Sequence, residues 1–158
     1  MIIIMLMSTF LNKIYIILPI FFLSFDLISE NHTVKMLNQG ADGVMVFEPA
    51  VLKINVGDTV SFIATDAAHN SASIPGMLPQ NASAWNGQLS RDITVTFSIP
   101  GIYGYQCTPH AMMAMVGFIQ VGGDSSNLQS IKNTADKFKS TFVMNQARLD
   151  NYLSQISQ

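Results

Sequence analysis

The stretch that constrains this chain most is residues 107–115, which reads Cys-Thr-Pro-His-Ala-Met-Met-Ala-Met. It holds the only cysteine of the 158 residues, Cys107, with His110 after two intervening residues and Met115 at its end. Thiolate, imidazole and thioether are soft donors that suit copper, and two His and one Cys with a weak axial Met form a blue-copper electron-transfer site. A strand, a loop and a second strand would bring these three donors around one point. A blue-copper site needs two histidines, so another part of the fold has to supply the second imidazole.

Two histidines elsewhere in the chain are candidates for that second imidazole. His69, followed by Asn70, lies in a segment without periodicity, whereas His32 lies at the frayed start of the expected folded part, so we favour His69. Asn70 is then expected to tie the two ligand-bearing loops together. The alternatives are that Cys107 is a buried structural thiol and that His110 is an ordinary surface histidine.

Three methionines compete for the axial position. Met115 begins the apolar run Met-Val-Gly-Phe-Ile, so a strand would hold its side chain, whereas Met112 and Met113 belong to the loop. The loop methionines are better explained as an adaptable apolar surface. Pro109 restricts the residue before it and stiffens the loop. The predicted ligands of one copper ion, cycling between Cu(I) and Cu(II), are therefore His69, Cys107, His110 and Met115.

Length and composition limit the classes of protein that fit. The length suits one domain with an appendage. Eight basic residues against ten acidic residues give a formal net charge of −2, which argues against nucleic-acid binding. A single cysteine allows no internal disulfide. We expect a monomeric electron carrier and no enzyme, because this chemistry transforms no substrate.

Residues 1–29 are predicted to be a secretory signal, because Lys13 precedes the apolar residues 14–23. The alternative is an uncleaved membrane anchor, but the apolar run is shorter than the roughly 20 residues that a membrane span needs. We therefore expect cleavage near Glu30 and a periplasmic protein that has no membrane contact afterwards.

Residues 30–123 have the pattern of a β-sandwich. Short apolar or alternating runs are separated by Gly and Pro turns, which predicts seven or eight strands. The predicted strands cover residues 33–37, 44–47, 51–54, 59–63, 92–97, 102–105 and 116–121. Residues 69–88 show no period, and we expect a long irregular connection packed by Trp85, with at most a short helical turn.

Residues 124–158 form a helical extension by their pattern. Apolar residues from Leu128 to Ile156 recur at spacings of three, four and seven, and residues 124–126 offer N-cap side chains. We expect a break into two helices at Asn133 and Thr134. Short helices are marginal in water, so they should pack on the outside of one sheet. The alternative is a partner-binding or coiled-coil tail.

At these residues the chain resembles the pseudoazurins, a group of periplasmic cupredoxins, over residues 34–122 and more weakly in the helices. The resembling segments are Met-Leu-Asn-Gln-Gly from Met36, Met-Val-Phe-Glu-Pro-Ala from Met45, Gly-Asp-Thr-Val from Gly57, His69-Asn70, Gly-Met-Leu-Pro from Gly76, Pro-Gly-Ile-Tyr-Gly from Pro100, and Cys-Thr-Pro-His with Met115. The resemblance implies an all-β, cupredoxin-like Greek-key sandwich of eight strands. It also implies the same four copper ligands and an electron-donor role, often to a copper nitrite reductase.

The chain departs from the pseudoazurins in the charge of its sandwich. Pseudoazurins usually carry lysines around the copper face, but residues 30–123 hold three basic and six acidic residues, a net charge of −3. The steering charge is therefore missing. We predict that redox partners dock with little salt dependence on an apolar patch, which consists of Met45, Pro109, Met112 and Met113.

Two further functions compete with electron transfer. A copper carrier or buffer could use the Met-rich loop to hand Cu(I) to another protein, and it would need an open, exchangeable site. An interaction module without metal would leave the position of the only cysteine unexplained. We prefer electron transfer because the donor set matches a known copper geometry.

Overall fold

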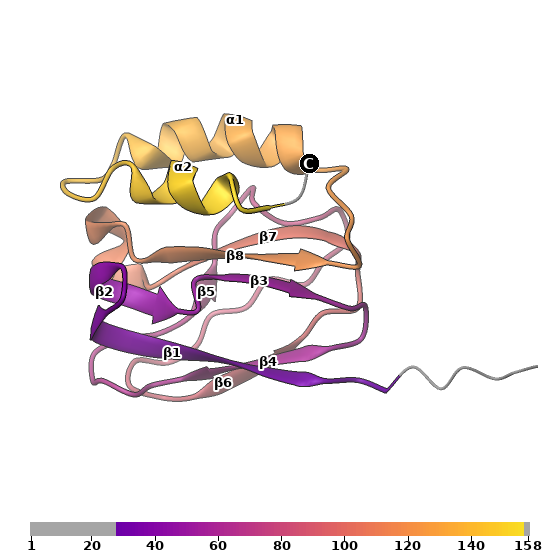
Figure 1. The fold of residues 1–158 in the computed structure, drawn as a ribbon, viewed down its shortest axis with the longest axis horizontal. Coiled ribbons are helices and arrows are strands. Elements are labelled where there is room, and N and C mark those ends of the chain that lie inside the picture. The colour runs from indigo at the N-terminus through magenta and orange to yellow at the C-terminus, as the bar shows by residue number, and fades with distance from the viewer. Residues whose placement is uncertain (1–27, 157–158) are drawn as a thin grey trace, which may run out of the picture.

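The computed structural model describes residues 28–156 and shows two four-stranded sheets packed face to face, with two helices on one of them (Figure 1). One sheet has the order β2-β1-β4-β6, and the other has the order β3-β8-β7-β5. The strands of the first sheet are β1 (Asn31–Gly40), β2 (Gly43–Glu48), β4 (Thr59–Ile63) and β6 (Ile93–Thr96). Those of the second are β3 (Val51–Ile54), β5 (Ala72–Ser73), β7 (Gly101–Gln106) and β8 (Val116–Val121).

The strand order is that of a Greek-key sandwich. β1 pairs antiparallel with β2 and parallel with β4, and β3 pairs parallel with β8. The all-β, cupredoxin-like sandwich predicted from the sequence is confirmed. The predicted strands at 51–54, 59–63 and 116–121 have the observed bounds, and β1 is longer than predicted.

The connection between residues 69 and 88 contains β5, a strand that the sequence analysis missed. Ala72 and Ser73 pair with the end of β7, and two residues are too few for an alternating pattern to be recognised. Trp85 packs this segment as expected. Its indole N–H donates to Ser71 Oγ at 3.0 Å, and the backbone N–H of Ser73 donates to its carbonyl at 3.0 Å.

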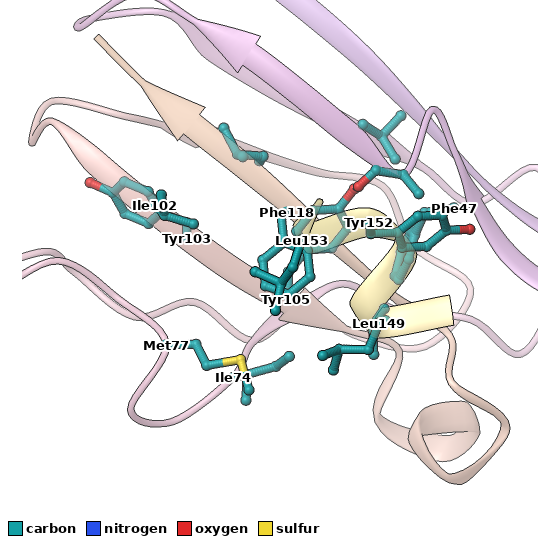
Figure 2. Packing of buried hydrophobic residues seen from close by; sticks show 14 of the residues in the cluster. Phe47, Ile74, Met77, Ile102, Tyr103, Tyr105, Phe118, Leu149, Tyr152 and Leu153 are labelled. Atoms are coloured by element: carbon teal, nitrogen blue, oxygen red, sulfur yellow. The ribbon is translucent and has the colours of Figure 1, made fainter. Parts of the chain in front are cut away.

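Aromatic side chains from both sheets fill the space between them. Phe47 and Phe62 of the first sheet meet Tyr105 of the second edge to face, with ring centroids 4.8 and 5.0 Å from Tyr105. Such pairs contribute about 0.5–1.5 kcal/mol beyond the burial of their area. Figure 2 shows Phe47 and Tyr105 in one cluster with Leu149 and Tyr152 of the C-terminal part.

The helical extension forms α1 (Leu128–Lys139) and α2 (Arg148–Leu153). The predicted break at Asn133 and Thr134 is wrong, because both residues lie inside α1. Their side chains form hydrogen bonds within the helix. Asn133 Oδ1 accepts a hydrogen bond from the Gln129 side chain, and Thr134 Oγ1 donates one to the Ser130 carbonyl. The chain leaves the helix at residues 140–147 instead.

The start of α1 also differs from the expectation of a cap at residues 124–126. Asp124 accepts the N–H of Ser126, and the helix begins only after Asn127. The Asn127 side chain bonds both backbone groups of Ile102 in β7 and so fixes the helix to the sheet. An N-cap residue is recognised by its type, but a residue that anchors to a distant strand is not.

The two helices lie on the outer face of the second sheet, as predicted, with α1 over β7 and α2 over β8 (Figure 1). Their apolar side chains Ile131, Ala135, Leu149 and Leu153 are buried there. The alternative of a partner-binding or coiled-coil tail is therefore not needed to explain the apolar stripe, because the sheet covers it in the described residues. None of the helices in the described part is long and apolar enough to cross a membrane. The predicted signal, residues 1–29, lies outside the described residues except for its last two.

Candidate metal centre

The segment between β7 and β8, predicted to be a loop, contains a short helix. Cys107 directly follows β7, and a 3-10 helix, η1 (Thr108–Met113), leads to Ala114 and Met115. Pro109 lies in the first turn, where a missing N–H costs nothing. The His110 N–H donates to the Cys107 carbonyl at 3.1 Å, and the Cys107 N–H donates to the Met115 carbonyl at 2.9 Å. These bonds close the segment into a rigid loop.

Three donor atoms of the predicted site face one another. The Sγ atom of Cys107 lies 3.6 Å from Nδ1 of His69 and 3.3 Å from Nδ1 of His110, and the two Nδ1 atoms are 3.1 Å apart. His69 and Cys107 are buried, and His110 is half-buried. Within the part of the chain that the structure describes, these residues form the one group of three or more metal-binding side chains.

The donor set fits a single soft metal ion. First-row metals bind imidazole nitrogen at about 2.0 Å and thiolate sulfur at about 2.3 Å, so one ion can reach three atoms separated by less than the sums of these lengths. Two imidazole nitrogens that face each other at 3.1 Å need a shared proton or a cation between them, because their lone pairs repel. The mixture of nitrogen and sulfur favours copper over magnesium or calcium.

The orientation of His69 is fixed by Asn38 in β1. Its Nε2 atom lies 3.0 Å from the Asn38 side-chain oxygen, which can only accept, so Nε2 carries the proton and Nδ1 offers its lone pair to the centre. Burial lowers the pKa of His69, and the nearby His110 lowers it further, against a smaller opposing effect of Asp66. A neutral imidazole is the form that binds a metal.

The Cys107 thiol is shielded from water. Burial raises its pKa, and hydrogen bonds from the backbone N–H groups of Asn70 and His110 partly oppose this rise. A thiolate buried in this way needs a positive partner, and a bound metal ion supplies one. The same N–H groups reduce the electron density on the sulfur and therefore tune an attached metal.

Asn70 ties the two ligand segments together, as the sequence analysis expected. Its side-chain oxygen accepts the N–H of Thr108 at 2.8 Å, and its amide donates to Thr108 Oγ1 at 3.1 Å and to the Gly87 carbonyl at 3.0 Å. Asn70 is buried. It holds His69 beside Cys107 although the two are 38 residues apart.

The remaining candidates lie in different surroundings. Met115 is fully buried immediately before β8, Met113 is partly buried, and Met112 is 55% exposed. His32 is bonded to Asp58 through Nε2 at 3.0 Å, whereas His69 lies at the cluster. Asn38 was missed as a site residue, because the sequence marks it as a turn and gives no sign of its partner.

Comparisons with known proteins agree with this geometry. The sequence model of the copper binding proteins, plastocyanin/azurin family, matches residues 34–122. A relative from Rhizobium leguminosarum bv. viciae is 44% identical over 131 residues, which are 83% of each chain. The pseudoazurin of Paracoccus pantotrophus is 38% identical over 126 residues, 80% of this chain and 83% of the relative.

The solved structure of a pseudoazurin from Sinorhizobium superposes with a TM-score of 0.70 at 42% identity, covering 82% of this chain and 98% of the other. The family model matches more than half of the chain, and the relatives align over most of their own length. This chain therefore belongs to the copper-binding plastocyanin/azurin family, and within it to the pseudoazurins, which are blue copper electron-transfer proteins.

Proposed function

We propose that His69, Cys107, His110 and Met115 bind one copper ion and that the protein carries single electrons between exported redox partners. The observation that supports this most is the arrangement of Cys107 Sγ and the two Nδ1 atoms, all within 4.8 Å of one another. A bound copper ion supplies the one-electron couple between Cu(I) and Cu(II).

The chain contributes a site that need not rearrange when the electron arrives or leaves. Asn38 holds the tautomer of His69, and Asn70 joins the two ligand segments. The loop that carries Cys107 and His110 is closed by backbone hydrogen bonds. A rigid ligand set that serves both oxidation states lowers the cost of reorganisation during electron transfer.

Met115 is the proposed axial ligand. It is buried next to β8, and its carbonyl accepts the N–H of Cys107, so its backbone cannot shift independently of the thiolate ligand. Met112 and Met113 are assigned to the surface instead. Exposed methionine adapts well to a partner that binds only briefly.

The docking surface is proposed to be the apolar patch formed by Met45, Pro109, Met112 and Met113. Pro109 and Met112 are exposed beside the ligand His110, whereas Met45 and Met113 are partly buried. A copper nitrite reductase is one candidate partner. The absence of steering charge in the sandwich favours a partner whose docking face is apolar.

We place the protein in the periplasm as a monomer, after removal of the predicted signal in residues 1–29. Lys13 and the apolar residues after it support export.

Copper carriage is the second candidate function, and the exposed Met112 is the observation that favours it. The burial of His69 and Cys107 argues for a metal that stays in place.

A visible absorption spectrum after addition of Cu(II) tests the proposed ligands and function. The purified protein should give an intense thiolate-to-copper band that a reductant bleaches and an oxidant restores. The Cys107→Ala variant should lack the band. Tight Cu(I) binding without a Cu(II) band would favour carriage, and no binding of either ion would refute the copper site.

A further inference from the structure

Arg148, at the start of α2, is a buried cation whose contacts lead to the ligand loop. Arg148 is only 7% exposed, and arginine keeps its charge in proteins. Within the described part of the chain no ion pair shorter than 4.0 Å involves Arg148, so the guanidinium is stabilised by other groups.

Those groups are four backbone carbonyls. Nη2 donates to Asp42 at 2.9 Å and to Val44 at 3.2 Å, and Nη1 donates to Met45 at 2.9 Å and to Ala114 at 3.2 Å. The planar fork of an arginine can bind two pairs of acceptors at once, which a lysine cannot. A buried charge without these acceptors would be strongly destabilising.

The two carbonyls bound by Nη1 belong to residues in an unfavourable backbone conformation. Met45 has φ 50° and Ala114 has φ 58°, in the left-handed region that side chains other than glycine rarely adopt. This conformation is energetically costly for residues other than glycine, and it persists only where the surroundings fix it. A single nitrogen of Arg148, Nη1, donates hydrogen bonds to the carbonyls of both residues.

The hydrogen bond from Arg148 to the Ala114 carbonyl also restrains Met115, because that carbonyl belongs to the peptide unit that joins the two residues. Both polar groups of the peptide unit between them are used, the Ala114 carbonyl by Arg148 and the Met115 N–H by the His110 carbonyl at 3.3 Å. Ala114 is fully buried, so without Arg148 its carbonyl would lose a partner that water does not readily replace. The Met115 carbonyl in turn accepts the N–H of Cys107.

We propose that Arg148 is a positioning residue that holds the Ala114–Met115 peptide, and with it the axial ligand, in place for the copper ion. This inference rests on the proposed ligation by Met115. α2 thereby supports the copper site in addition to covering the sheet.

The test uses Arg148→Lys, which keeps the charge but loses the fork, and Tyr152→Phe as a matched control. Tyr152 lies on the same helix and donates to Asp42 Oδ2 at 2.8 Å without reaching the ligand loop. In copper-free protein, hydrogen exchange at the Met115 amide should become about tenfold faster in Arg148→Lys, the size expected for a lost charge-assisted hydrogen bond. It should stay unchanged in Tyr152→Phe.

In the copper-loaded protein, Arg148→Lys should raise the reduction potential, because a loosened axial donor stabilises Cu(II) less. Tyr152→Phe should leave the potential unchanged. Equal effects of the two variants, or a lower melting temperature of Arg148→Lys with unchanged exchange at Met115, would show that Arg148 only attaches the helix. If the wild-type chain binds no copper, the proposed function fails, whereas the exchange measurement still tests the positioning by Arg148.

Discussion

Of the two histidines in the metal-binding cluster, His69 lies farther from Cys107 in sequence, and its position depends more on other residues. Asn70 sets its distance from Cys107, and Asn38 sets its tautomer through the 3.0 Å contact with Nε2. Groups that orient a metal-binding histidine are commonly worth 10–100-fold in metal affinity. We therefore expect His69 to be a strong ligand only while Asn38 accepts the hydrogen bond from its proton-bearing nitrogen.

Replacing Asn38 with Leu should weaken Cu(II) binding by about 10–100-fold, because the His69 ring loses the acceptor that fixes it. Asn38→Asp keeps an acceptor and should bind nearly as well as the wild type. A chelator competition titration measures the affinities, with Gln39→Leu, at an exposed neighbouring position, as the control. Wild-type affinity in Asn38→Leu would show that Asn38 has no part in the site.

At the scale of elements, one buried carboxylate joins the first strand to the turn before β4. Asp58 accepts the N–H groups of Glu30 and Asn55, each at 2.9 Å, and contacts His32 Nε2 at 3.0 Å. The bond from Glu30 lowers the pKa of Asp58 most, His32 lowers it further, and burial opposes both. The ionised form is therefore stabilised by folding.

This lowered pKa predicts a stability that is lost in acid. The contribution of Asp58 is fully present above the unfolded pKa of about 3.8 and disappears as the pH falls through the lower folded value. The difference in unfolding free energy between wild type and Asp58→Asn should be largest above pH ~5 and should shrink below pH ~4. Denaturant titrations of the copper-free protein across this range measure it. A difference that does not change with pH would contradict the assignment.

The sequence allowed prediction of the elements whose pattern is local. β3, β4 and β8 alternate or form apolar runs, and the spacing of Cys107 and His110 predicted two of the three donors that the structure brings together. β5 escaped because it is two residues long, and the break between the helices was misplaced because Asn133 and Thr134 find partners inside α1. Asn38 and Arg148 escaped because their roles depend on residues distant in the chain.

For the whole molecule, the distribution of charge decides how partners approach. The sandwich, residues 30–123, carries a net charge of −3, and the surface beside His110 is apolar, with Met112 55% exposed. Steered pairs gain about tenfold or more in association rate at low salt and lose it as salt is added. The sandwich therefore lacks the net positive charge that would steer it to an acidic partner.

Electron transfer to its partner should therefore change much less than tenfold between low and high salt, as stopped-flow mixing measures. Met112→Lys should create a salt-dependent rate with an acidic partner, because it puts a positive charge into the patch. Val56→Lys adds the same charge at a position that is 41% exposed and packs near Gly122, at the opposite end of β8 from the ligand loop. It should leave the salt dependence nearly unchanged, because its charge lies farther from the docking surface. A steep fall of the wild-type rate with salt would refute apolar docking and would point to steering charges outside the sandwich.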